Sequence, residues 1–261
     1  MIYEFCTQTH PGLLRENNED AAAFDESSGL AVLADGMGGY NAGEVASSMA
    51  TTFVHTELAR WLLEAGSQAS GRDLRRAMDA CVHNANLAVY TAANVNEHYA
   101  GMGTTLVVGI FQDSRVLVGH IGDSRCYRFR RNVLQQITKD HSLLQEQLDA
   151  GLITPQQAAT SNNKNLVTRA LGIDDSVLLE VHEHGVEEGD LYLMCSDGLS
   201  DMVDDAPIAR IMETDAPLAQ KARQLISIAN AHGGRDNITV LLVQAVAGAK
   251  KRGLVSRLLG S

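Results

Sequence analysis

Four aspartates have the residue type and the surroundings needed to hold metal ions. Each lies at one end of an apolar run that we expect to form a β-strand, and the four are Asp35, Asp123, Asp197 and Asp236. Strand ends can meet along one edge of an antiparallel sandwich, where clustered carboxylates would need a counter-charge. Oxygen-only ligands suit Mg²⁺ or Mn²⁺ better than Zn²⁺. Any single Asp-Gly or Asp-Asn pair is more often an ordinary turn, so the hypothesis rests on all four together.

A pair of such ions could hydrolyse a phosphate ester. Two divalent ions roughly 3.5–4 Å apart share a carboxylate and a bridging water, lower the pKa of that water and hold the phosphate oxygens during in-line attack. The run Asp35-Gly36-Met37-Gly38-Gly39 suits this centre. Its glycines permit tight turns, and the Gly36 carbonyl could itself be a ligand.

A second polar segment, Arg15–Asp20 (RENNED), directly precedes an expected strand. The Arg15 guanidinium could hold a phosphate through two hydrogen bonds, although a lone arginine is more often a surface residue. Glu19 and Asp20 could hydrogen-bond to water on the metals, or could simply be solvated.

The elements that must position these residues are short strands and longer helices. Short connections between apolar runs, such as Gln112–Ser114, indicate antiparallel pairing. Strands interleaved with helix pairs predict a layered α+β domain with helices outside. We expect strands at Tyr3–His10, Ala21–Asp25, Leu30–Ala34, Thr104–Phe111, Val116–Ile121, Arg125–Phe129, Leu178–His182, Asp190–Cys195 and Ile238–Val246. We expect helices at Ala42–Leu63, Arg72–Asn94, Leu143–Ala150 (with Gly151 as a cap) and Pro217–Ala231.

Composition restricts the class of protein. The chain has 261 residues, of which 45% are hydrophobic, and a formal net charge of -11. A basic footprint is needed for general nucleic-acid binding, so we expect no nucleic-acid partner. Phosphate substrates remain compatible with an acidic chain, because bound cations attract them.

The cysteines and the N-terminus favour a cytoplasmic protein. The four cysteines form no CxxC pair and lie among apolar neighbours, which predicts buried, reduced thiols. The first residues lack the pattern of a signal peptide, and no apolar run approaches the roughly 20 residues that span a membrane.

One domain and a tail are expected. No Ser/Pro-rich linker divides residues 1–247, whereas residues 248–261 mix basic and apolar side chains. Such a tail could touch a membrane or a partner. We expect a loosely packed end instead.

Taken together, seven segments make the chain resemble a known family. It is similar to the PPM family, the metal-dependent serine/threonine phosphatases of the protein phosphatase 2C type, in its compact bacterial form. The matching segments run in the family's order over nearly the whole chain. They are Arg15–Asp20 (RENNED), Val32–Glu44 (VLADGMGGYNAGE), Gly103–Leu106 (GTTL), His120–Arg125 (HIGDSR), Leu166–Gly172 (LVTRALG), Leu193–Leu199 (LMCSDGL) and Gly234–Val240 (GRDNITV).

The resemblance implies an α-β-β-α sandwich, two antiparallel sheets flanked by helix pairs, with two or three Mn²⁺ or Mg²⁺ ions at one edge. It implies that Asp35 bridges both metals and that the Gly36 carbonyl binds the first. Asp197 and Asp236 would hold the second. Asp123, with Asp197, matches a third and weaker position.

The same resemblance implies roles for the remaining polar residues. Arg15 would clamp the phosphate and join Asp35, Asp197 and Asp236 as a catalytic residue. Asp20 would act through water, with Glu19 beside it, and Asn237 would orient its neighbours.

Two departures from the family pattern affect the mechanism. Animal members place a histidine, a candidate general acid, where this chain has Met37, which cannot donate a proton. The flap, about residues 140–166, often carries a His-Pro pair, but this chain reads Ser161-Asn162-Asn163-Lys164-Asn165 there. His141 remains near the flap, where a lone histidine is more often structural.

We therefore expect an enzyme that hydrolyses phosphoserine and phosphothreonine in proteins and opposes a serine/threonine kinase. Its partners would be phosphorylated proteins, including that kinase and its substrates. Two alternatives remain open: a non-catalytic phosphoprotein-binding module of the same fold, which should have lost metal ligands, and a phosphatase for a small metabolite.

Overall fold

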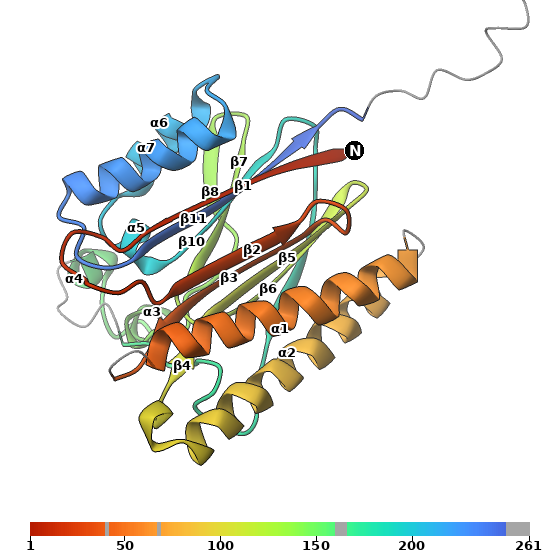
Figure 1. The fold of residues 1–261 in the computed structure, drawn as a ribbon. Helices are drawn as coiled ribbons and strands as arrows, with labels where there is room; N and C mark the ends of the chain where they lie inside the picture. The colour runs from red at the N-terminus through yellow and green to blue at the C-terminus, as the bar shows by residue number, and fades with distance from the viewer. Residues whose placement is uncertain (40–41, 67–68, 160–165, 249–261) are drawn as a thin grey trace, which may run out of the picture.

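Two antiparallel β-sheets lie face to face in the computed structural model, which describes residues 1–39, 42–66, 69–159 and 166–248 (Figure 1). The first sheet has the order β1-β11-β10-β7-β8 and the second the order β2-β3-β5-β6-β9, with β4 paired to β3. The first sheet comprises β1 (Ile2–His10), β7 (Arg125–Arg130), β8 (Val133–Gln136), β10 (Leu191–Cys195) and β11 (Ile238–Val246). The second comprises β2 (Asp20–Asp25), β3 (Leu30–Met37), β4 (Gly103–Thr104), β5 (Leu106–Gln112), β6 (Arg115–Ile121) and β9 (Glu180–Gly185).

Helices cover the outer face of each sheet (Figure 1). The long helices α1 (Ala42–Ala65) and α2 (Gly71–Val95) pack on the second sheet. The first sheet carries α5 (Asp197–Ser200), α6 (Asp205–Glu213) and α7 (Leu218–Ala231). The predicted α-β-β-α sandwich is therefore confirmed. The remaining elements are η2 (Glu97–Tyr99), α3 (Leu143–Asp149) and α4 (Pro155–Ala159).

Strand β3 shows how one segment serves two apolar layers. Successive side chains of a strand point to opposite faces. Leu30 and Val32 accordingly pack among the helices α1 and α2, whereas Ala31 and Leu33 pack between the sheets. All four are fully buried. A strand buried on both faces reads as a continuous apolar run, and that run ends at Asp35.

Helix α1 approaches β3 through small residues. Its buried face includes Ala42, Gly43, Ala46 and Ala50. Short side chains let the helix backbone lie close to the sheet, and this brings the first turn of α1 up to the end of β3. The next helix, α2, begins with a capping box formed by Ser70 and Asp73.

Most predicted elements are present, but some differ in their bounds and several short ones were not predicted. The strand expected at Leu178–His182 begins instead at Glu180, because Leu179 packs among the helices. Edge strand β9 then continues through polar residues, most of which are exposed. The strand expected at Thr104–Phe111 is divided into β4 and β5. We did not predict η2, α4, α5 or α6 and gave no bounds for β8, all of which are short.

The helix expected at Leu143–Ala150 is confirmed, and Gly151 follows it with a φ of 67°. All four cysteines are free thiols, and three of them are buried. Among the described residues, no helix has the length and apolarity needed to cross a membrane. The predicted tail lies outside the described residues, apart from Gly248.

The layer between the sheets should dominate stability. Leu33→Ala should lower the free energy of unfolding by about 2–5 kcal/mol, because it leaves a cavity between two rigid sheets. Leu63→Ala is the matched control: Leu63 is 59% exposed, and its loss should cost about 0.5 kcal/mol or less. Urea unfolding of both variants measures the difference, and equal costs would contradict this description of the core.

Candidate metal centre

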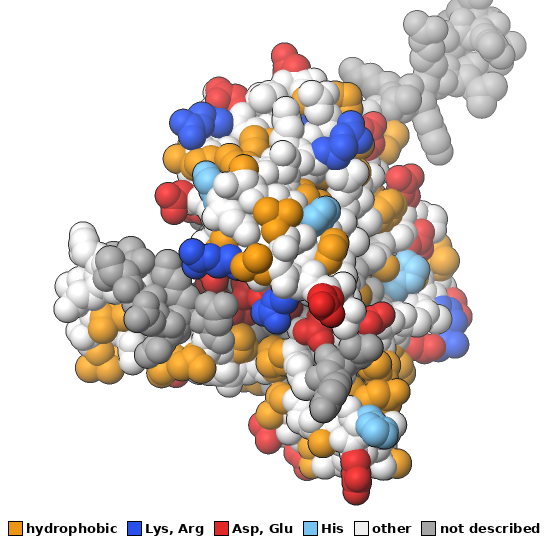
Figure 2. All heavy atoms as spheres, turned by 60° about the vertical axis from the view of Figure 1, so that its left-hand side comes forward, with side chains coloured by type: hydrophobic (Ala, Val, Ile, Leu, Met, Phe, Trp, Pro, Cys, Tyr) orange, Lys and Arg blue, Asp and Glu red, His pale blue; other side chains and the backbone are white. Residues whose placement is uncertain are grey.

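One edge of the sandwich gathers carboxylates from both sheets. On the second sheet, Asp20 of β2 lies directly opposite Asp35 of β3, so both side chains project from the same face. On the first sheet, Asp197 opens α5 immediately after β10, and Asp236 lies two residues before β11. Asp123 lies in the turn where the chain passes from β6 to β7 and so changes sheet. Figure 2 looks toward this edge and shows acidic side chains in a recess with basic side chains nearby.

A hydrogen bond joins the two halves of the cluster. The Ser196 hydroxyl, from the first sheet, donates to Asp20 Oδ2 on the second sheet at 2.7 Å. The other oxygen of Asp20, Oδ1, is buried and has no hydrogen-bond partner within the described part of the chain. A buried carboxylate oxygen without a partner is costly, so this atom is suited to face a cation or its water.

The electrostatics show how closely the carboxylates are packed. Burial, reinforced by the charges of Asp20 and Asp197, raises the pKa of Asp35 well above its ordinary value. Burial raises the pKa of Asp197 in the same way, with further contributions from Asp123 and Asp201. Each carboxylate makes ionisation of its neighbours harder, as expected of like charges in one site.

Two further pKa values support this picture. Burial raises the pKa of Asp20 to about 6. Burial and the charge of Asp140 raise the pKa of Asp123 to about 6. A cluster of oxygen donors that resists its own ionisation is chemically matched to hard divalent cations such as Mg²⁺ and Mn²⁺. The residues present therefore fit these ions.

Gly36 could not be another residue. A Cβ there would lie 2.0 Å from the carbonyl oxygen of Gly43 and 2.7 Å from that of Glu19. The Gly36 N–H donates to the Glu19 carbonyl at 3.0 Å. The predicted candidate ligand thus lies where three backbone segments meet.

Asn237 holds the segments around the cluster in place. Its side-chain amide donates to the carbonyls of Pro11 (3.0 Å) and Asn17 (2.8 Å). Its side-chain oxygen accepts from the Glu19 N–H at 2.7 Å. The residue therefore ties the end of β1 and the Arg15–Asp20 segment to the start of β11.

Arg15 lies at the edge of the cluster and pairs with one of its members. Its guanidinium donates to Asp236 Oδ2 at 2.8 Å, and its side chain is 53% exposed. Glu19 is half-buried nearby, and burial raises its pKa. An exposed guanidinium beside clustered carboxylates is available to an anionic ligand.

Sequence reasoning missed other charged residues near the cluster. Arg125 makes a bidentate ion pair with Asp140, with N–O distances of 2.7–3.0 Å. Asp201 contributes charge to both Asp123 and Asp197. The spacing of Asp201, four residues after Asp197 on a helical turn, was the available signal.

Met37 and His141, which we singled out from the sequence, both lie in the described part of the structure. Met37 pairs with Gly103 beside the cluster and offers no proton. His141 begins the flap, where its Nδ1 accepts from the Gly122 N–H at 3.1 Å. Residues 161–165, which carry the flap's departure from the family pattern, lie outside the described residues.

A second group of possible ligands, His120, His141 and Glu180, has donor atoms within 4.8 Å of one another. The two imidazole rings are stacked, with centroids 4.6 Å apart and planes inclined by 15°. An imidazole binds a metal in its ring plane, so two nearly parallel rings do not fit one ion as they stand. His141 Nε2 instead lies 3.2 Å from Glu180 Oε2, and the group forms a polar cluster.

Comparison with known proteins decides the family. The model of the family described as protein phosphatase 2C matches residues 15–242. The chain belongs to this family. It is therefore a protein phosphatase of the 2C type.

Several relatives cover almost the same length. The serine/threonine phosphatase stp of Listeria innocua is 35% identical over 240 residues, which cover 91% of this chain and 94% of the relative. The crystal structure of the Mycobacterium tuberculosis phosphatase PstP/Ppp matches with a TM-score of 0.87 and 36% identity, covering 95% of this chain and all of the other. A structure of the PstP catalytic domain contains two manganese ions; it matches with a TM-score of 0.80 and 36% identity, covering 94% of this chain and 99% of that one.

The buried histidine cluster predicts a pH dependence of stability. Burial holds the pKa of His120 below its ordinary value, so near pH 6.5 the unfolded chain binds more protons than the folded one. The contribution of neutral His120 to the free energy of unfolding is therefore present above about pH 6.5 and is lost as the pH falls below it. The excess in free energy of unfolding of the wild type over His120→Asn should therefore shrink between about pH 7.5 and pH 5.5. Chemical denaturation at each pH measures it, and a constant excess would contradict the assignment.

Proposed function

We propose that this phosphatase hydrolyses phosphoserine and phosphothreonine in proteins by means of water activated between two divalent ions. The observation that supports the proposal most is the crowding of carboxylates from both sheets, which raises the pKa of Asp35 and Asp197. Mn²⁺ or Mg²⁺ bound there would offset this repulsion, generate hydroxide near neutral pH and polarise the phosphate oxygens. The two manganese ions in the related PstP structure support the same assignment.

The ligands would be divided between two principal positions. Asp35, which several other carboxylates surround, would bridge the ions, and the Gly36 carbonyl would complete the first position. Asp197 and Asp236, both from the first sheet, would hold the second. Asp123 is a neighbour of Asp197 and would share a third position with it.

Other residues would orient the substrate and the ligands. Arg15 would release Asp236 and bind the phosphate through its guanidinium, at a site within reach of the cluster. Asp20, whose Oδ1 lacks a partner among the described residues, would accept a hydrogen bond from water, with Glu19 beside it. Asn237 would keep these segments in register.

The biological setting follows from the same assignment. Substrates would be phosphorylated proteins, and the enzyme would oppose a serine/threonine kinase, which would itself be one substrate. A cytoplasmic location is supported by the four free thiols. We also propose that residues 1–247 act as one phosphatase domain, with residues 248–261 as an appended tail.

Removal of a proposed ligand tests the catalytic role. Asp197→Asn keeps the shape of the side chain but removes its charge, so Mn²⁺-dependent turnover of a phosphothreonine peptide should fall at least roughly a hundredfold, or about 2.7 kcal/mol. Asp204→Asn is the matched control, because Asp204 is an exposed helix cap with no side-chain capping bond. It should retain turnover. Full activity in Asp197→Asn would refute the assignment of Asp197 as a metal ligand, whereas a wild type without any Mn²⁺-dependent turnover would favour the non-catalytic binding module.

The absence of a proton donor at position 37 gives a second test. Met37→Ala should keep metal-dependent turnover within roughly threefold of the wild type, since a methionine transfers no proton. Steady-state kinetics at saturating Mn²⁺ measures the change. A collapse of turnover with Mn²⁺ affinity preserved would show that Met37 positions a reacting group.

A further inference from the structure

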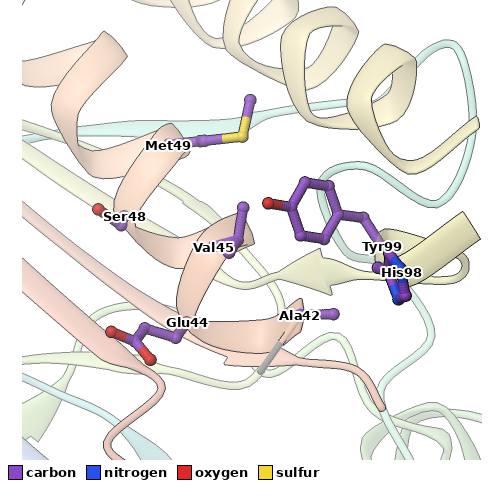
Figure 3. A pocket seen from close by; sticks show the side chains of 7 residues that line it. All are labelled: Ala42, Glu44, Val45, Ser48, Met49, His98 and Tyr99. Carbon is purple, nitrogen blue, oxygen red and sulfur yellow. The ribbon is translucent and has the colours of Figure 1, made fainter. Parts of the chain in front are cut away.

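A hollow of about 970 Å³ lies between the start of α1 and the short helix η2, and its lining is mainly apolar. We call it the α1–η2 pocket; its apolar lining residues are Ala42, Val45, Met49 and Tyr99, and its polar ones are Glu44, Ser48 and His98. Figure 3 shows the Tyr99 ring directed toward Val45 and Met49 of α1. These three side chains are partly buried against the helical core, yet the hollow leaves part of their surface open.

Helix α1 thus presents two different faces. Val45 and Met49, four residues apart, lie on one side of the helix, and Ala42 lies at the boundary between this side and the buried face. Gly43, together with the small residues after it, instead packs toward β3. The side chains of Val45 and Met49, which line the pocket, therefore lie on a different side of α1 from the small buried residues that contact the sheet.

The pocket lies next to the candidate metal centre. Gly43 lies between them: its carbonyl packs on Gly36, and a Cβ added to it would lie 2.8 Å from the Glu19 carboxyl carbon. The charge of Glu44, which lines the pocket, acts on Glu19 as well. The pocket and the candidate metal centre are therefore close neighbours.

The dimensions suit a peptide. Val45 and Met49 are separated by about 6 Å along the helix axis, because each residue rises about 1.5 Å. An extended peptide advances about 3.3 Å per residue, so a peptide bound at the candidate metal centre can place a residue close in sequence to the phosphorylated one at the neighbouring pocket.

We propose that the α1–η2 pocket receives an apolar side chain of the phosphoprotein substrate, from a residue close in sequence to the phosphorylated serine or threonine. The inference rests on the proposed function and deepens it, since it assigns a sequence preference to the substrate. The apolar walls favour a leucine-sized or methionine-sized side chain, and Glu44 in the lining disfavours an acidic one.

The test compares phosphothreonine peptides in which a single leucine is moved from three residues before to three residues after the phosphothreonine, in a background of serine. With Mn²⁺, the wild type should hydrolyse the peptides with leucine at one or two of these positions with about tenfold higher kcat/KM than the others. The difference should lie mainly in KM, because a side chain bound away from the reacting atoms stabilises the bound substrate and the transition state equally. Equal values at every position would overturn the proposal. A wild type that hydrolyses neither these peptides nor p-nitrophenyl phosphate would instead refute the proposed function.

Variants tie the preference to the pocket. Val45→Glu and, as a milder change, Met49→Ser should each reduce the leucine-to-serine ratio of kcat/KM to near one. The ratio is read within each variant, so a general loss of activity does not imitate the effect. Leu63→Glu, an exposed position at the far end of the same helix, should keep the wild-type ratio. Retention of the preference in both pocket variants would also overturn the proposal.

Discussion

The repulsion among carboxylates at one edge of the sandwich is the constraint on which the rest of the structure depends. Asp20 and Asp35 face the same side of one sheet because of strand register, and Asp197 and Asp236 come from the other sheet. Strand register therefore keeps Asp20 and Asp35 side by side. A fold that holds like charges this close gains stability from any ligand that neutralises them.

The structure resists this repulsion with a polar framework that links the sheets. Ser196 donates across the sheets to Asp20, and Asn237 joins three backbone segments around the cluster. Arg125 binds Asp140 through two nitrogens beside Asp123. These contacts hold the segments that carry the carboxylates in place, which reduces the ordering that ion binding would require.

Local sequence patterns predicted the parts of this arrangement that depend on neighbours in the chain. Apolar runs that end in aspartate identified strands β3 and β10, and the resemblance to a family supplied the order of the ligands. Local patterns could not reveal the partners of Arg125 and Arg15, because these pairs join distant segments. For the same reason, Leu179 was assigned to a strand although it packs among the helices, and the α1–η2 pocket was not foreseen.

Titration of the metal-free protein with Mn²⁺ by calorimetry tests the central claim most directly. The account predicts at least two bound ions per chain, accompanied by a rise in melting temperature that grows with Mn²⁺ concentration, because the ions bind the folded cluster and not the unfolded chain. The absence of both heat and stabilisation at millimolar Mn²⁺ would contradict the claim that these carboxylates form a metal centre.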